Sequence, residues 1–194
     1  MWLPADRPTR ISFGALLLIG WFAQVNGWRV TAYILLAAVL HELGHLLVLR
    51  MVGAKIKGIS IGILGAVMEA DTHCLSYGQE LAAVLAGPLM NLLTAFICGT
   101  VGADPVFVGA SAVLCGFNLL PMRPLDGGRA LQLFLVWKCG PGTGERFAGW
   151  IGGMTGLLLA ASLGYLMYRT GGSLWLLPPA WWMLHAGIRE FLGK

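Results

Sequence analysis

Charged residues are scarce in this chain of 194 residues. Only 11% of its residues are Asp, Glu, Lys or Arg, whereas 57% are hydrophobic and the mean hydropathy is +0.75. Soluble domains carry about 25% charged residues, so this chain has too little polar material to cover a globule in water. The composition predicts an integral membrane protein and excludes a disordered chain.

Several motifs are also missing. The four cysteines form no CxxC pair and are interpreted as small packing residues. The net charge is +4, but no basic stripe is interleaved with aromatic residues, so we expect no nucleic-acid partner. No A-x-A-like cleavage site follows the first apolar run, which argues against a cleaved signal peptide.

The sequence contains many long apolar runs. A helix needs roughly 20 residues to cross about 30 Å of hydrocarbon, and six candidate segments can be drawn. They predict an all-α polytopic membrane protein with about six transmembrane helices, at residues 11–26, 30–50, 80–102, 105–122, 147–168 and 173–188.

Residues 55–71 differ from the rest of the chain. The stretch KIKGISIGILGAVMEAD alternates and contains β-branched residues and glycines, which favours a short membrane-associated β-hairpin between the second and third segments. No linker or repeat divides the chain, so residues 1–194 are interpreted as a single domain.

The thirteen Lys and Arg residues indicate orientation. With a cytoplasmic N-terminus, nine lie inside and only Arg29 and Arg169 lie outside, while Arg123 and Arg129 flank a proline-rich break. This bias predicts that both termini are cytoplasmic. We expect the membrane to be a bacterial plasma membrane. Residues 41–45 then lie in the inner half of the second segment.

The second segment contains His41-Glu42-Leu43-Gly44-His45, an HExxH motif. On a helix the two histidines share one face one turn apart and can bind one zinc ion, while Glu42 projects about 100° away and can take a proton from a water at the metal. Ionisable residues at membrane depth are costly, which favours a bound cation over a chance motif.

Catalytic zinc takes three protein ligands, so a third must come from elsewhere. The position that a metzincin would use is occupied by Met51, which excludes that class. Asp126 follows Pro121 and Pro124 and precedes two glycines, a setting suited to a ligand. The same setting suits a turn or helix N-cap aspartate, and Glu69 and His73 are further candidate ligands.

Three motifs in this order carry a family resemblance. HELGH in the second segment, Ala86-Gly87-Pro88-Leu89-Met90-Asn91 in the third, and Asn118-x-x-Pro121-x-x-Pro124-Leu125-Asp126-Gly127 after the fourth resemble the motifs of the site-2 protease family of intramembrane zinc metalloproteases. The chain looks most like the branch that contains stage IV sporulation protein FB. Taken alone, Gly87-Pro88 and Asn91 indicate a packing kink.

The resemblance implies Zn²⁺ bound by His41, His45 and Asp126, with Glu42 as general base. It also implies that Asn118 contacts the substrate backbone or the active-site network, and that the hairpin, with Gly62 and Gly65, offers an edge to an extended substrate. The expected function is hydrolysis of a peptide bond within or near a membrane segment of a membrane or membrane-associated protein. Candidate substrates are a transcription-factor precursor and an anti-sigma factor. We expect no PDZ or CBS domain.

Other functions are less well supported by the sequence. GxSG and GxGD motifs, which serine and aspartyl intramembrane proteases require, are absent. The alternative from a different class is a small metal or ion transporter that uses the same His, Glu and Asp residues as a midplane site. The role of Glu42, as a base or as a ligand, distinguishes the two functions.

Overall fold

The computed structural model describes residues 10–62, 65–71, 75–171 and 176–193. The chain divides into two compact units, Met1–Gly116 and Phe117–Lys194. The expectation of a single domain stays a prediction.

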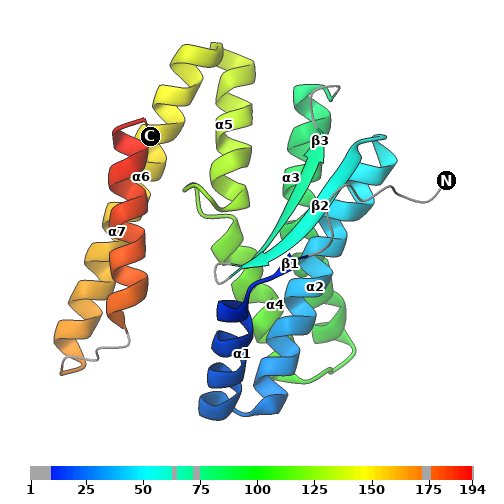
Figure 1. Ribbon diagram of the computed structural model, residues 1–194, viewed down its shortest axis with the longest axis vertical. Helices are drawn as coiled ribbons and strands as arrows, with labels where there is room; N and C mark the ends of the chain where they lie inside the picture. Colours follow the sequence, from blue (N-terminus) through cyan, green and yellow to red (C-terminus); the bar gives the residue numbers. More distant parts are fainter. Residues whose placement is uncertain (1–9, 63–64, 72–74, 172–175, 194) are drawn as a thin grey trace. The chain divides into compact units, whose positions relative to one another are not determined.

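The first unit is built on helices α1 (Phe13–Asn26), α2 (Trp28–Met51), α3 (Tyr77–Thr100) and α4 (Pro105–Asn118), the last of which ends just past the unit boundary. Gly27 separates α1 from α2 with a φ of 84°, a backbone conformation that glycine adopts without strain. Ser76 and Gln79 form a capping box at the start of α3. The long pair α2 and α3 packs together and forms the core of this unit (Figure 1).

A small sheet lies beside these helices (Figure 1). Its strands are β1 (Arg10–Ile11), β2 (Lys55–Gly62) and β3 (Gly65–Asp71), in the order β1-β2-β3. The antiparallel β2–β3 pair, with Gly62 opposite Gly65, confirms the predicted hairpin, although residues 63–64 lie outside the described residues. The short parallel β1 is an addition that the sequence does not predict.

A polar cluster connects the start of α2 to the α3–α4 connection. Asp104 accepts hydrogen bonds from Arg29 and, at 3.0 Å, from the Tyr33 hydroxyl, and its other oxygen accepts from the Val106 N–H. The hydrogen bond from Arg29, followed by that from Val106, holds the pKa of the Asp104 carboxyl below its usual value. The cluster therefore fixes the end of α2 that lies away from the HExxH motif.

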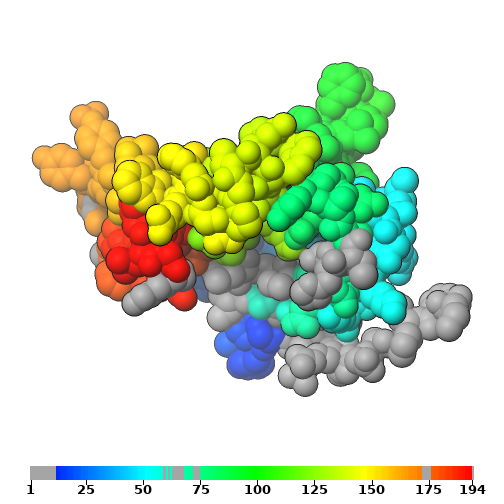
Figure 2. All heavy atoms as spheres, turned by 90° about the horizontal axis from the view of Figure 1, so that it is seen from above, coloured from blue at the N-terminus to red at the C-terminus, as the bar shows by residue number. Residues whose placement is uncertain are grey.

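The second unit contains α5 (Asp126–Cys139), α6 (Pro141–Arg169) and α7 (Leu177–Phe191). Its helices approach closely because glycines face the contacts. A Cβ atom on Gly156 would lie 2.9 Å from Gly187 Cα, and one on Gly144 would lie 2.5 Å from the Val136 nitrogen. Figure 2 shows the atoms of α6 directly against the red atoms of α7. Small residues of this kind allow close helix packing in a membrane.

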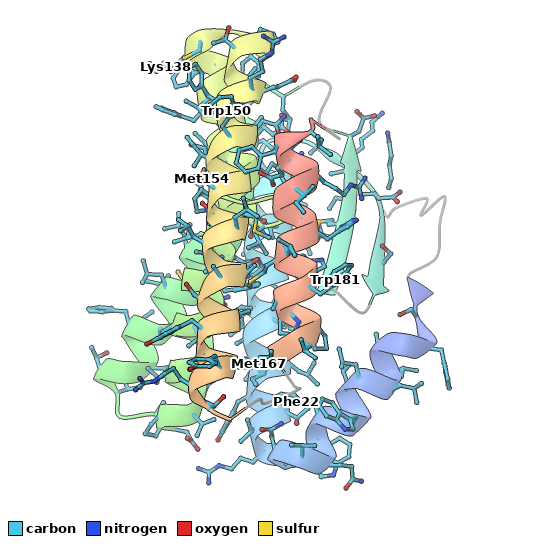
Figure 3. All side chains as sticks on the ribbon, turned by 90° about the vertical axis from the view of Figure 1, so that its left-hand side faces the viewer. Phe22, Lys138, Trp150, Met154, Met167 and Trp181 are labelled. Carbon is cyan, nitrogen blue, oxygen red and sulfur yellow. The ribbon has the colours of Figure 1, made fainter. Side chains whose placement is uncertain are left out.

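Three of the described helices are long and apolar enough to cross a membrane: α2, α3 and α6. They match the predicted segments at 30–50, 80–102 and 147–168. The apolar helices α1 and α4 have 14 residues each, and α7 has 15, so the count of six spans stays a prediction. Large apolar side chains such as Trp150 and Met154 project outward from α6, as expected of a lipid-facing surface (Figure 3).

The α6–α7 packing yields a stability prediction. Gly156→Leu places a side chain against the backbone of α7, whereas the matched control Gly164→Leu meets no atom within 4 Å on the same helix. We expect Gly156→Leu to lower the free energy of unfolding by about 1–3 kcal/mol relative to the control. Thermal unfolding in detergent, followed by circular dichroism, measures the difference. Equal midpoints for the two variants would contradict the described packing.

Candidate metal centre

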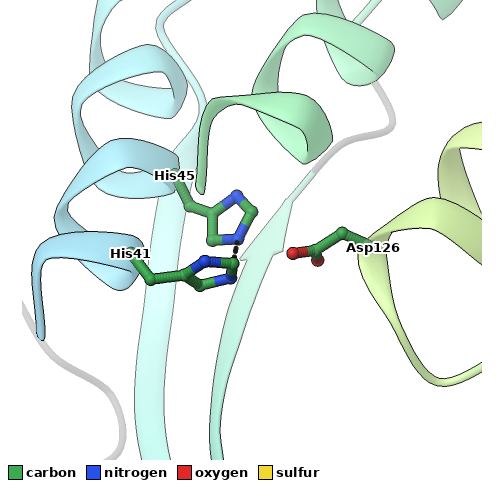
Figure 4. A group of neighbouring side chains, drawn as sticks. All are labelled: His41, His45 and Asp126. Atoms are coloured by element: carbon green, nitrogen blue, oxygen red, sulfur yellow. Dashed lines mark hydrogen bonds between the residues drawn. The ribbon is translucent and has the colours of Figure 1, made fainter. Parts of the chain in front are cut away.

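In the first unit, the candidate metal-binding residues are a pair of histidines on α2. His41 and His45 are one helical turn apart, and their Nε2 atoms lie 3.1 Å from each other (Figure 4). Two nitrogens that bind one tetrahedral zinc at about 2.0–2.1 Å lie about 3.3 Å apart, so the observed spacing suits a shared cation. His41 is only 5% exposed, which keeps this polar pair away from bulk solvent.

The His45 ring is oriented by the backbone of α3. Its Nδ1 lies 2.8 Å from the Ala83 carbonyl oxygen, which can only accept a hydrogen bond. Nδ1 therefore carries the proton and Nε2 keeps its lone pair. A histidine that binds a metal through one ring nitrogen usually donates a hydrogen bond from the other ring nitrogen, which fixes the orientation of the ring.

The His41 ring is oriented by Asn91 of α3, which is fully buried. The Asn91 amide nitrogen lies 3.1 Å from His41 Nδ1, and its oxygen is buried with no hydrogen-bond partner among the described residues. Rotating the amide by 180° lets that oxygen accept from His41 Nδ1–H, which leaves the Nε2 lone pair available for a metal. In that orientation the Asn91 contact prepares His41 to bind a cation through Nε2.

Two glycines make the close approach of α2 and α3 possible. A Cβ atom on Gly44 would lie 2.5 Å from the Ala86 carbonyl oxygen, so this position inside the HExxH motif admits the α3 backbone. A Cβ atom on Gly87 would lie 2.3 Å from His45 Nε2 and 2.8 Å from His41 Nε2. The missing side chain of Gly87 therefore leaves space beside both ring nitrogens.

Glu42 follows His41 on α2, so its side chain starts about 100° around the helix from the first imidazole. It is partly buried, as His45 is. A carboxylate in this relation to two imidazoles is suited to proton transfer beside a metal.

Asp126 belongs to the second unit and is the first residue of α5. The residue at the N-cap position is Leu125, so the alternative interpretation of Asp126 as the N-cap itself is wrong. Gly127 and Gly128 follow, and Cβ atoms on them would lie 2.2 Å from the Leu119 oxygen and 2.3 Å from the Met122 carbonyl carbon. Its side chain offers a carboxylate oxygen, a donor of the kind that binds a metal ion.

The remaining predicted site residues belong to other elements, and their roles stay predictions. Asn118 is the last residue of α4, Gly62 ends β2 and Gly65 begins β3. Glu69 is exposed on β3, and His73 lies outside the described residues. The structure brings His41 and His45 together with Gly44, Gly87 and Asn91.

Sequence reasoning assigned Gly87 and Asn91 to a packing kink and gave Gly44 no role. Pro88 lies inside α3, and the kink stays a prediction. The Asn91 side chain nevertheless contacts His41, one ring of the site. The sequence spacing indicates that Gly87 and Asn91 can act together. They are four residues apart and so lie on one face of their helix, as the two histidines do on theirs.

Comparison with known proteins agrees with this geometry. Residues 29–110 match the profile of Peptidase family M50. The chain is 32% identical over 185 residues to a putative zinc metalloprotease from Synechocystis, covering 84% of this chain and 48% of that protein. It is 32% identical over 173 residues to a zinc metalloprotease from Methanocaldococcus jannaschii, covering 82% and 50%.

Two further similarities agree. Stage IV sporulation protein FB of Bacillus subtilis is 30% identical over 109 residues, which cover 52% of this chain and 38% of that protein. The site-2 protease structure from Methanocaldococcus jannaschii aligns with a TM-score of 0.64 at 25% identity, over 93% of this chain and 89% of that one. The chain spans half or less of the length of the curated relatives named here.

The space beside Gly87 yields a binding prediction. Gly87→Ala would push a methyl group against both Nε2 atoms, so we expect the dissociation constant for Zn²⁺ to rise about 10–100-fold. Competition with a chromophoric chelator measures it. Gly99→Ala on the same helix is the control, because its Cβ atom would make only an ordinary contact at 3.8 Å. Unchanged affinity in Gly87→Ala would show that the metal lies elsewhere.

Proposed function

We propose that this chain, which carries a domain of peptidase family M50 with the fold of a site-2 protease, is an intramembrane zinc metalloendopeptidase. The observation that carries the proposal is the pair of Nε2 atoms 3.1 Å apart on a long apolar helix. The names of the relatives and the donor chemistry of the histidines support zinc as the metal.

His41, His45 and Asp126 would hold the zinc ion, two as neutral imidazoles and one as a carboxylate. When bound, zinc supplies a Lewis acid that polarises the scissile carbonyl and makes water a stronger nucleophile at neutral pH. The hydrogen bond from His45 to Ala83 and the contact between His41 and Asn91 hold the rings so that their Nε2 atoms converge.

Glu42 would act as the general base and then as the general acid. Its carboxylate takes a proton from the attacking water as the new C–O bond forms. The resulting carboxylic acid gives that proton to the amide nitrogen as the C–N bond breaks, so the products are a peptide carboxylic acid and an amine, which then ionise in water by passing the remaining proton from acid to amine. One residue can carry both transfers because a carboxylate that has accepted a proton becomes a carboxylic acid that can donate it.

The substrate would bind as an extended strand along β3. Peptide bonds inside a helix are hidden, so a membrane segment must unwind before hydrolysis, and pairing with a strand edge would hold the opened chain. In the sheet, β2 is flanked by β1 and β3, whereas β3 has one neighbouring strand among the described residues. Gly62 and Gly65 lie at the β2–β3 turn, and Asn118 would contact the substrate backbone.

The distribution of charge supports a cytoplasmic location for both termini, at a bacterial plasma membrane. Arg50 would anchor the inner end of α2. Nine residues separate His41 from Arg50, which corresponds to about 13 Å along a helix, so cleavage would fall in the inner leaflet. Substrates would be membrane proteins cut near the cytoplasmic end of a membrane segment. The comparisons give no support to a transporter.

The mechanism is tested by Glu42→Gln, which removes the base but keeps the size of the side chain. We expect bound zinc to stay at the wild-type level while peptide cleavage falls about 10²–10⁴-fold. Metal analysis and a cleavage assay on single-span membrane peptides give the two measurements. Cleavage at the wild-type rate would rule out Glu42 as the base, and loss of zinc would make it a ligand, as a transporter would use it.

The third ligand is tested by Asp126→Ala. We expect a measurable fall in zinc content, because catalytic zinc needs a third protein donor besides the two histidines. Metal analysis of the purified variant measures this, with Glu145→Ala at an exposed acid of α6 as control. Unchanged zinc in Asp126→Ala would move the third ligand to Glu69 or His73.

A further inference from the structure

A buried carboxylate in the second unit lies far along the chain from the residues named so far. Glu190, one residue before the end of α7, is only 6% exposed. Burying a carboxylate away from water is costly unless strong partners compensate. The contacts of this side chain therefore indicate what it does.

The partners of Glu190 lie in the loop that precedes α5. One carboxylate oxygen accepts a hydrogen bond from the Arg123 backbone N–H. The same oxygen lies 3.8 Å from Arg123 Nε, a longer ionic contact to a side chain that is 43% exposed. The backbone hydrogen bond is the stronger constraint, since it acts on the main chain three residues before Asp126.

Helix α6 is shaped to admit this carboxylate. A Cβ atom on Gly152 would lie 1.6 Å from the second carboxylate oxygen of Glu190 and 3.1 Å from the Pro121 carbonyl oxygen. A Cβ atom on Gly149 would lie 2.9 Å from the Glu190 backbone oxygen. The loop and the end of α7 thus meet over a glycine surface on α6.

The other side of the loop is held by α5 itself. Gly127 and Gly128 lie directly against the backbone of Leu119 and Met122, and the Met122 side chain is fully buried. The Leu125 N–H donates to the Met122 carbonyl at 3.0 Å. The segment between Leu119 and Leu125 is therefore held between the first turn of α5 and the carboxylate of α7.

We propose that Glu190 is a positioning residue that, through the Arg123 amide, fixes the loop presenting Asp126 and so sets the affinity of the metal site. The proposal rests on the function proposed above, in which Asp126 is a ligand. A hydrophobic residue would pack as well at this position, but it would leave the Arg123 N–H without its acceptor.

Two substitutions at position 190 distinguish the effect of side-chain length from the effect of side-chain charge. Glu190→Gln keeps the length of the side chain and an oxygen that can accept from Arg123 N–H, but it loses the charge. Glu190→Asp keeps the charge and withdraws the carboxylate by one methylene. We expect Gln to behave like the wild type within about 3-fold and Asp to be impaired, because reach to the amide is what matters. Glu145→Gln and Glu145→Asp, at an exposed acid of α6, are the matched controls.

The first readout is hydrogen exchange in the metal-free full chain, which requires no activity. We expect the Arg123 amide to exchange at least 10-fold faster in Glu190→Asp than in the wild type, with amides in the middle of α6 unchanged. Equal exchange rates at Arg123 would overturn the proposal, because the hydrogen bond would then not protect the loop.

The second readout is the dissociation constant for Zn²⁺, with the kinetic constants for cleavage measured alongside it. We expect about a 10-fold weaker affinity in Glu190→Asp, and a lower kcat at unchanged KM when zinc is saturating. Faster exchange with unchanged Zn²⁺ affinity, in a protein where Asp126→Ala does weaken binding, would overturn the link to the metal. If Asp126→Ala leaves affinity unchanged, the proposed third ligand fails, and with it this link, while the exchange result still decides whether Glu190 holds the loop.

Discussion

The site depends above all on the close backbone approach of α2 and α3. A side chain at position 44 would collide with the Ala86 carbonyl, and one at position 87 would collide with both imidazoles. Glycine at both positions avoids these collisions. Because the helices can come this near, the carbonyl of Ala83 and the amide of Asn91 reach the rings of His45 and His41. A larger residue at either glycine would separate the rings from the groups that orient them.

Orientation of the rings matters more in this setting than in a soluble enzyme. In the interior of a membrane protein there is little water to satisfy a misplaced N–H, so each ring nitrogen needs a fixed partner. The partner of His45 is a backbone carbonyl, which can only accept a hydrogen bond. The partner of His41 is an amide, which can present either an oxygen or an N–H. The two histidines are therefore prepared for a metal by different means.

The sequence predicts those parts of the structure that depend on local patterns. Hydropathy finds α2, α3 and α6, alternation finds the β2–β3 hairpin, and HExxH spacing finds the paired imidazoles. It misses β1 and α5: the first is a two-residue strand held only by β2, and the second has a polar first turn and too few residues to span a membrane. The roles of Gly44, Gly87 and Asn91 also escape local reasoning, because each is defined by the helix opposite.

The second unit uses glycine for another purpose. In α6, glycines at 149, 152, 153 and 156 admit the backbone and side chains of α7, so the packing of two helices depends on surfaces with almost no side-chain volume. Small residues of this kind let the two helices approach closely. The buried Glu190 adds a polar contact between α7 and the loop before α5, because its carboxylate accepts a hydrogen bond from the Arg123 N–H. A single carboxylate thereby connects the last helix to the loop that ends at Asp126.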